Sequence, residues 1–309
     1  MGLMRGLGWR FWFLLLACAA MCLSLTQPTL SMKQAVQRYI LVIDITQSMN
    51  ARDYHVEHMP ADRLGFVKAA IRQALYNLPC GSEVGLGLFT TQNSQLLFEP
   101  LEICEHFAII DDVLEHVDWR MAWGANSFIA QGLLTGIREI AQRNADIRLV
   151  FFTDGQQFPP VTESPNFPDI PGAVRGLIVG VGGAQPVPIP KLDMENRPQG
   201  FWEYADLRDF LPPSELVDQR ARTSNYYLSW LDEQSLQELA AMTGLSYHRL
   251  ESSAGLSAAL RSSDLAVEHS VDADVRWVLA LLALILLLLT YLVTFRKIRR
   301  PRGAPAKHI

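Results

Sequence analysis

The sequence predicts an α/β fold in which a doubly wound, mostly parallel sheet carries helices on both faces. From residue 39 onward, short apolar segments typical of buried strands alternate with segments of helical periodicity. Three of the apolar segments end in aspartate or glycine, at Asp44, Asp154 and Gly183. In this class of fold, ligands bind beyond the carboxyl ends of the strands. The same pattern therefore predicts where a functional site would lie.

The individual elements follow from local patterns. Residues 39–43 are apolar throughout, and apolar residues at helical spacing predict a helix over 62–78 that Pro79 ends. Residues 183–227 are rich in proline and polar residues, so we expect a long surface excursion there. The remaining expected elements are strands at 83–91 and 95–100, helices at 105–117 and 127–142, strands at 147–155 and 175–183, a helix at 232–244, a strand at 245–251 and a short helix at 256–267.

The two ends of the chain have the composition of targeting or membrane segments. Residues 1–26 have the layout of a signal peptide or N-terminal membrane anchor, and the sequence leaves open whether they are cleaved, retained or lipidated. Residues 277–295 carry no charge, which predicts a transmembrane helix. The basic tail at 296–309 would then be cytoplasmic, which places residues 36–267 outside the cytoplasm.

Charge and cysteine content narrow the function classes. The formal net charge is −5, but nine of the 27 basic residues and none of the 32 acidic residues lie before residue 30 or after Asp274. The middle of the chain therefore carries about −14, which excludes a nucleic-acid partner on electrostatic grounds. Cys80 and Cys104 are the two cysteines of this part, and an oxidising compartment would let them pair; the sequence leaves the disulfide open.

Oxygen-bearing side chains gather where two of the predicted strands end and where one helix begins. They are Asp44, Thr46, Ser48, Ser127 and Asp154. Carboxylates and hydroxyls are hard ligands, so they predict a divalent cation site for Mg²⁺ first, with Mn²⁺ or Ca²⁺ as alternatives. The pattern places no nucleophile beside a base, so we expect binding rather than catalysis. Metal-assisted hydrolysis at Asp44 and Asp154 is the enzymatic alternative.

These residues carry a resemblance to a known family. "DITQSM" resembles the D-x-S/T-x-S signature of von Willebrand factor A domains, "GANS" looks like the loop with their third hydroxyl, and "FTDG" resembles their aspartate-bearing strand end. The resemblance covers residues 36–267 and implies a metal-ion-dependent adhesion site. By this analogy the hydroxyls of Thr46, Ser48 and Ser127 contact the metal, and Asp44 and Asp154 hold it directly or through water. A domain that has kept the fold and lost the metal is the alternative.

Longer matches indicate a bacterial subgroup. "DITQSMNARDY" and "ADRLGFVK", which contain Asp53 and Arg63, resemble membrane-anchored Bat-type proteins encoded beside MoxR-type ATPases. The Thr-Gln-Ser version of the motif looks most like MxaL-type proteins of methanol-oxidation gene clusters. That resemblance implies a non-enzymatic protein of the inner membrane whose periplasmic domain binds a client through an acidic side chain, and assists assembly or Ca²⁺ insertion of a quinoprotein (methanol) dehydrogenase. A MoxR-type ATPase or other VWA proteins are the further partners it implies.

Two alternatives accompany this interpretation. A Bat-type stress-response or adhesion receptor would use the same metal site for another protein ligand. Four tryptophans, Trp119, Trp123, Trp202 and Trp230, could form a recognition surface, but packing in the core or in loops is the favoured interpretation of each.

Overall fold

The computed structural model describes residues 8–122, 124, 126–143, 146–159, 172–207 and 227–298. These residues divide into two compact units, 35–268 and a second unit formed by the two ends of the chain. Three predicted features lie outside the described residues in whole or in part: Trp123, residues 208–226 of the predicted excursion, and the predicted basic tail from residue 299 onward.

A six-stranded sheet forms the centre of the larger unit, with the strand order β11-β6-β5-β2-β3-β4. The strands from β11 to β3 run parallel to one another. Their bounds are Arg38–Asp44 for β2, Glu83–Thr90 for β3, Asn93–Glu102 for β4, Arg148–Thr153 for β5, Gly176–Gly180 for β6 and Ser246–Arg249 for β11.

The sheet is mixed and only partly parallel, which corrects the prediction of a mostly parallel sheet. Strand β4 pairs antiparallel with β3, and Thr90 lies opposite Asn93. Only Thr91 and Gln92 separate the two strands, and a parallel crossover needs a connection of about a dozen residues or more. The short turn therefore reverses the chain at this edge.

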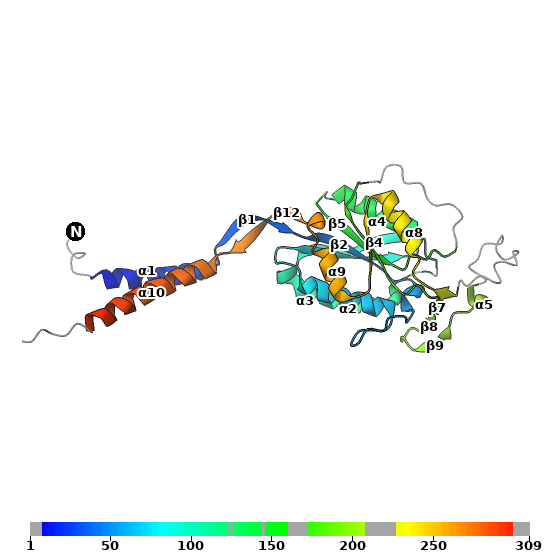
Figure 1. The fold of residues 1–309 in the computed structure, drawn as a ribbon, viewed down its shortest axis with the longest axis horizontal. Helices are drawn as coiled ribbons and strands as arrows, with labels where there is room; N and C mark the ends of the chain where they lie inside the picture. Colours follow the sequence, from blue (N-terminus) through cyan, green and yellow to red (C-terminus); the bar gives the residue numbers. More distant parts are fainter. Residues whose placement is uncertain are drawn as a thin grey trace, which may run out of the picture. The chain divides into compact units, whose positions relative to one another are not determined.

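Helices cover both faces of this sheet, because alternate residues of each strand point to opposite sides. Helices α2, α3 and α9 lie on one face, and α4 and α8 lie on the other (Figure 1). Tyr39, Leu41 and Ile43 pack with the first group, whereas Ile40 and Val42 pack with the second. The bounds are Arg63–Tyr76 for α2, Ile103–His116 for α3, Ile129–Arg143 for α4, Glu233–Thr243 for α8 and Ser253–Leu260 for α9. Short 3₁₀ turns span Gln47–Asn50 (η1), Trp119–Met121 (η2) and Ser263–Leu265 (η4).

The excursion between β6 and α8 contains short paired strands in its described part. Strand β7 (Val187–Pro188) pairs with β10 (Leu228–Ser229), and β8 (Pro190–Leu192) pairs with β9 (Pro198–Phe201). One short helix, α5, spans Tyr204–Leu207. The pairing of β7 with β10 brings the two ends of the excursion together, although about forty residues separate them in the sequence.

The second unit contains α1 (Trp9–Ser24) and α10 (Arg276–Ile298), which lie side by side, and the paired strands β1 (Thr29–Val36) and β12 (Val267–Asp274) (Figure 1). The prediction of a transmembrane helix at 277–295 is wrong on this structure. Among the residues that the structure describes, no helix combines the length and the apolar character needed to cross a membrane.

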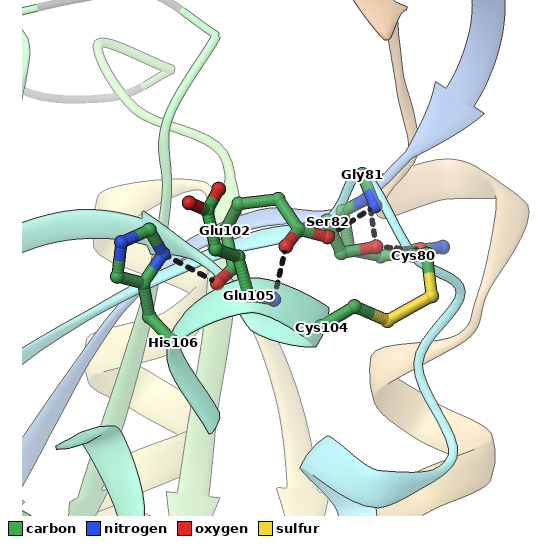
Figure 2. The surroundings of a disulfide bond; sticks show 8 residues. Cys80, Gly81, Ser82, Glu102, Cys104, Glu105 and His106 are labelled. Carbon is green, nitrogen blue, oxygen red and sulfur yellow. Dashed lines mark hydrogen bonds between the residues drawn. A yellow bond between two sulfur atoms is a disulfide. The ribbon is translucent and has the colours of Figure 1, made fainter. Parts of the chain in front are cut away.

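A disulfide joins Cys80, in the connection after α2, to Cys104 in the first turn of α3. Figure 2 shows that the Glu102 carboxylate lies beside it, where it accepts hydrogen bonds from the backbone N–H groups of Gly81 and Glu105, each at 2.6 Å. The disulfide closes the loop that contains strands β3 and β4, with a sequence separation of 24 residues.

Replacing both cysteines in a Cys80→Ala/Cys104→Ala variant is expected to lower the free energy of unfolding by about 2–4 kcal/mol, because the unfolded chain regains the freedom that the closed loop removes. Urea unfolding with and without reductant measures this. Reductant should destabilise the wild type and leave the double variant unchanged. The free cysteines Cys18 and Cys22 supply the control pair. Equal stability of the wild type and the Cys80/Cys104 variant would contradict the expectation.

Candidate metal centre

The two predicted carboxylates lie at the ends of neighbouring central strands. Asp44 is the last residue of β2, and Asp154 follows the last residue of β5 directly. These strands are paired in parallel, with Ile43 opposite Phe152. Both aspartate side chains are fully buried. The register of the sheet therefore places two buried carboxylates at the same edge.

The three predicted hydroxyl residues line one cavity at this edge. Thr46 and Ser48 come from the turn after β2, where their side-chain oxygens lie 3.3 Å apart. Ser127 precedes α4 and is held by a pair of backbone hydrogen bonds with Phe158, at 2.6 and 2.8 Å. The structure therefore places all five residues that the sequence predicted at this edge of the sheet. The three hydroxyl residues line the cavity, and the two buried carboxylates lie outside its lining.

Short hydrogen bonds orient the Asp44 carboxylate. Its Oδ1 accepts from the backbone N–H of Thr46 at 2.9 Å and from the Thr46 hydroxyl at 2.7 Å. Its Oδ2 accepts from the Thr153 hydroxyl at 2.7 Å. Because the Thr46 hydroxyl donates its proton to Asp44, a lone pair of Thr46 Oγ1 stays available to a cation.

The Asp154 carboxylate is held by a different set of groups. Its Oδ2 accepts from Arg63 Nη1 and from the Ser229 hydroxyl, each at 2.9 Å. The same Arg63 side chain donates from Nη2 to Asp53 Oδ2 at 2.7 Å. Arg63 is fully buried, and it is the first residue of α2, where the Asp62 carboxylate caps the helix by accepting from Gly65 N–H. One guanidinium therefore joins the start of α2 to the candidate metal centre.

The charge of this cluster favours a cation. It contains the three carboxylates of Asp44, Asp53 and Asp154 against the single guanidinium of Arg63. Burial, together with the nearby charge of Asp154, raises the pKa of Asp44 to about 7, despite the hydrogen bonds from Thr153 and Thr46. Burial acts in the same direction on Asp53, but the hydrogen bonds and charge of Arg63 outweigh it and hold the pKa of Asp53 below its usual value. A divalent ion would balance the excess negative charge.

The Ser127 hydroxyl gives a direct test of whether these residues fit a metal. Its Oγ is buried and has no hydrogen-bond partner among the described residues. A buried hydroxyl without a partner costs about 1–3 kcal/mol of stability, so a further group is expected to contact it. A cation bound by Thr46, Ser48 and Ser127 would supply that partner. The donor set is made of hard oxygens, which suits Mg²⁺, Mn²⁺ or Ca²⁺.

Sequence patterns did not identify two residues of this centre, Thr153 and Ser229. Thr153 is a β-branched residue at the end of a strand, so its residue type indicates only strand structure. Its contact with Asp44 depends on the register of β5 on β2. Ser229 lies beyond the excursion, and only the pairing of β10 with β7 carries it to Asp154. For Ser229 the sequence contains no signal that we can identify.

Comparison with known proteins identifies the family of this part of the fold. Residues 39–157 match the model of the von Willebrand factor type A domain. This part of the chain is a VWA domain. No match was found among curated proteins.

Two solved structures share the fold of the VWA domain. One is an aerotolerance-related membrane protein from Bacteroides fragilis NCTC 9343, carrying multiple mutations to serines, with 18% identity and a TM-score of 0.50 over 72% of this chain and 96% of that one. The other is the conserved hypothetical protein BatB from Bacteroides thetaiotaomicron, with 18% identity and a TM-score of 0.50 over 74% of this chain and 96% of that one. At this identity the likeness shows the fold alone.

Proposed function

We propose that this VWA protein is a non-enzymatic binding protein that binds a client protein through a divalent cation, with Mg²⁺ as the preferred ion. The hydroxyls of Thr46, Ser48 and Ser127 hold the ion, and an acidic side chain of the client completes its coordination. The buried Ser127 Oγ, which has no hydrogen-bond partner in the described part of the chain, is the observation that carries the proposal. Neutral hydroxyl ligands leave the ion electrophilic, so it attracts a carboxylate.

A binding role fits the arrangement of these groups better than catalysis. The Asp44 carboxylate is occupied by Thr46 and Thr153, and the Asp154 carboxylate by Arg63 and Ser229. Neither carboxylate lines the cavity. A general base has to reach the proton that it removes, and both candidates are held away from the open space.

The disulfide supports an exported client-binding domain. Disulfides persist in oxidising compartments such as the bacterial periplasm, and the Cys80–Cys104 bond fits such a compartment. Within that compartment, the Thr-Gln-Ser motif supports a role in assembly of, or Ca²⁺ insertion into, a quinoprotein (methanol) dehydrogenase. A MoxR-type ATPase or another VWA protein is the further partner in this proposal.

The structural neighbours support a second candidate function. One is named BatB, and the other is described as an aerotolerance-related membrane protein. A Bat-type stress-response or adhesion receptor would use the same ion for a different protein ligand. The identity of the captured protein separates the two candidates, since the first requires a dehydrogenase or its subunits.

Capture from a periplasmic extract on the immobilised full chain tests the proposal. We expect one acidic client to be retained in Mg²⁺ and released by EDTA, and a Ser127→Ala variant to retain at least tenfold less, because the ion loses one of its three hydroxyl ligands. A Ser82→Ala variant is a control, since that serine is buried away from the cavity. Capture that persists undiminished in EDTA would contradict the proposal.

A further inference from the structure

A largely apolar cavity of about 190 Å³ adjoins the candidate metal centre. Thr46, Ser48 and Ser127 contribute hydroxyl groups to the polar part of its lining. The same part includes Gln47, Gln156, Gln157 and Asp232, whose carboxylate accepts hydrogen bonds from the backbone N–H and the hydroxyl of Ser235. The apolar part comes mostly from the excursion and is called the aromatic wall below. It consists of Phe158, Ile189, Trp202, Leu207, Leu228 and Trp230.

Ser229, which lies between Leu228 and Trp230 of the aromatic wall, connects this wall to the metal centre. The Ser229 hydroxyl donates to Asp154 Oδ2, whereas the residues on either side of it, Leu228 and Trp230, line the cavity. The pairing of β10 with β7 and the hydrogen bond from Leu231 N–H to the carbonyl of Gly183, at 2.7 Å, fix the same segment. The aromatic wall therefore has a defined position relative to the candidate metal ligands.

The indole of Trp202 carries an unused donor. Its Nε1 is buried and has no hydrogen-bond partner among the residues that the structure describes. The residue itself is held in place, because its backbone N–H donates to the carbonyl of Ile189 at 3.0 Å and Lys191 Nζ lies 5.1 Å from the ring centroid. A buried N–H without an acceptor is costly, so a ligand that brings a carbonyl oxygen would relieve this cost.

Three groups of the cavity thus define the chemistry of one ligand. A cation on the hydroxyls takes a carboxylate, the aromatic wall takes a bulky apolar side chain, and the Trp202 indole takes a carbonyl oxygen. An extended peptide offers all three at once, because residues i and i+2 face the same side and the backbone carbonyls lie between them. We infer that the site recognises a client segment in which an acidic residue is followed two positions later by a bulky apolar residue. This inference rests on the proposed function.

Binding of short peptides to the full chain in Mg²⁺ tests the inference. The probes are three capped peptides, Ala-Glu-Ala-Phe-Ala, Ala-Glu-Ala-Ala-Ala and Ala-Gln-Ala-Phe-Ala, so that no terminal carboxylate competes. Calorimetry should show the first binding about 10- to 100-fold more tightly than the second, as expected for burial of one phenylalanine side chain. The third should bind more weakly than the first by at least tenfold, because it lacks the carboxylate.

Two variants separate the parts of the site. Trp202→Phe keeps a bulky ring and removes the N–H, so it should weaken the phenylalanine peptide severalfold. Trp202→Ala should reduce the advantage of the phenylalanine peptide to less than threefold. Both should bind Mg²⁺ as the wild type does, measured in the absence of peptide. Trp119→Phe is the matched control, since its indole donates to Asn196 and lies outside this cavity, and it should change neither affinity.

The outcomes distinguish this inference from the proposed function. Normal Mg²⁺ binding with equal affinity for the first two peptides would overturn the inference but would not contradict the proposed metal-dependent binding of a client. Failure to bind Mg²⁺ would overturn the proposed function and the inference with it. An undiminished preference for the phenylalanine peptide in EDTA would also overturn the inference, because the aromatic wall would then act without the metal.

Discussion

An Arg63→Met variant is expected to lose about 3–5 kcal/mol of its free energy of unfolding, because it leaves buried carboxylates without their counter-charge. Arg63 is fully buried and forms ion pairs with Asp53 at 2.7 Å and with Asp154 at 2.9 Å. Methionine fills much of the same space but provides no donor. Urea unfolding of the full chain measures the loss.

Arg72 supplies the matched control, since it lies on the same helix and pairs with Asp111 at a partly exposed position. An Arg72→Met variant should lose about 1 kcal/mol or less, as surface ion pairs do. An Arg63→Lys variant should fall between the two, because lysine keeps the charge but cannot span both carboxylates with a planar fork. Equal losses for Arg63→Met and Arg72→Met would contradict the role assigned to Arg63.

An Asp44→Asn variant is expected to lose all stabilisation by Mg²⁺. At a Mg²⁺ concentration one hundred times its dissociation constant, the wild type should gain about 2.7 kcal/mol, because the ion binds only the folded chain. The variant lacks one of the two buried charges behind the ion. Thermal unfolding over a range of Mg²⁺ concentrations measures the difference.

In the absence of Mg²⁺, the Asp44→Asn variant and the wild type should have similar stability. Without the ion, Asp44→Asn should lie within about 1 kcal/mol of the wild type, since it removes a buried charge that Asp154 repels and keeps an oxygen for the Thr46 hydrogen bonds. Asp112→Asn, at an exposed position of α3, is the control and should respond to Mg²⁺ as the wild type does. A Mg²⁺ response in Asp44→Asn as large as that of the wild type would contradict this account.

Most of the fold of the larger unit could be predicted because its determinants are local. The apolar run before Asp44 and the helical spacing after Asp62 each specify one element. The carboxyl ends of neighbouring parallel strands then have to meet, which is why Asp44 and Asp154 could be placed together from the sequence. The antiparallel direction of β4 depends on a turn of only two residues. The transmembrane assignment of residues 277–295 was inferred from composition alone.

The remainder of the site depends on contacts between distant segments. The Arg63 network joins residues from three separate parts of the chain, and the sequence shows only a loop acid and a base at the start of a helix. Trp202 and Trp230, for which packing was the favoured interpretation, line the cavity beside the metal centre because β7 pairs with β10. Strands β7 and β10 are two residues long, which is too short for a periodic pattern in the sequence to predict their pairing.

The location of a bound ion tests the central claim most directly. Crystals of the full chain grown with Mn²⁺ would show an anomalous difference peak wherever the ion binds. We predict a peak within about 2.5 Å of the hydroxyl oxygens of Thr46, Ser48 and Ser127, at the distance expected for oxygen ligands of such ions. No peak at this position, with Ser127 Oγ satisfied by another protein group, would contradict the claim that this edge of the VWA domain is a metal centre.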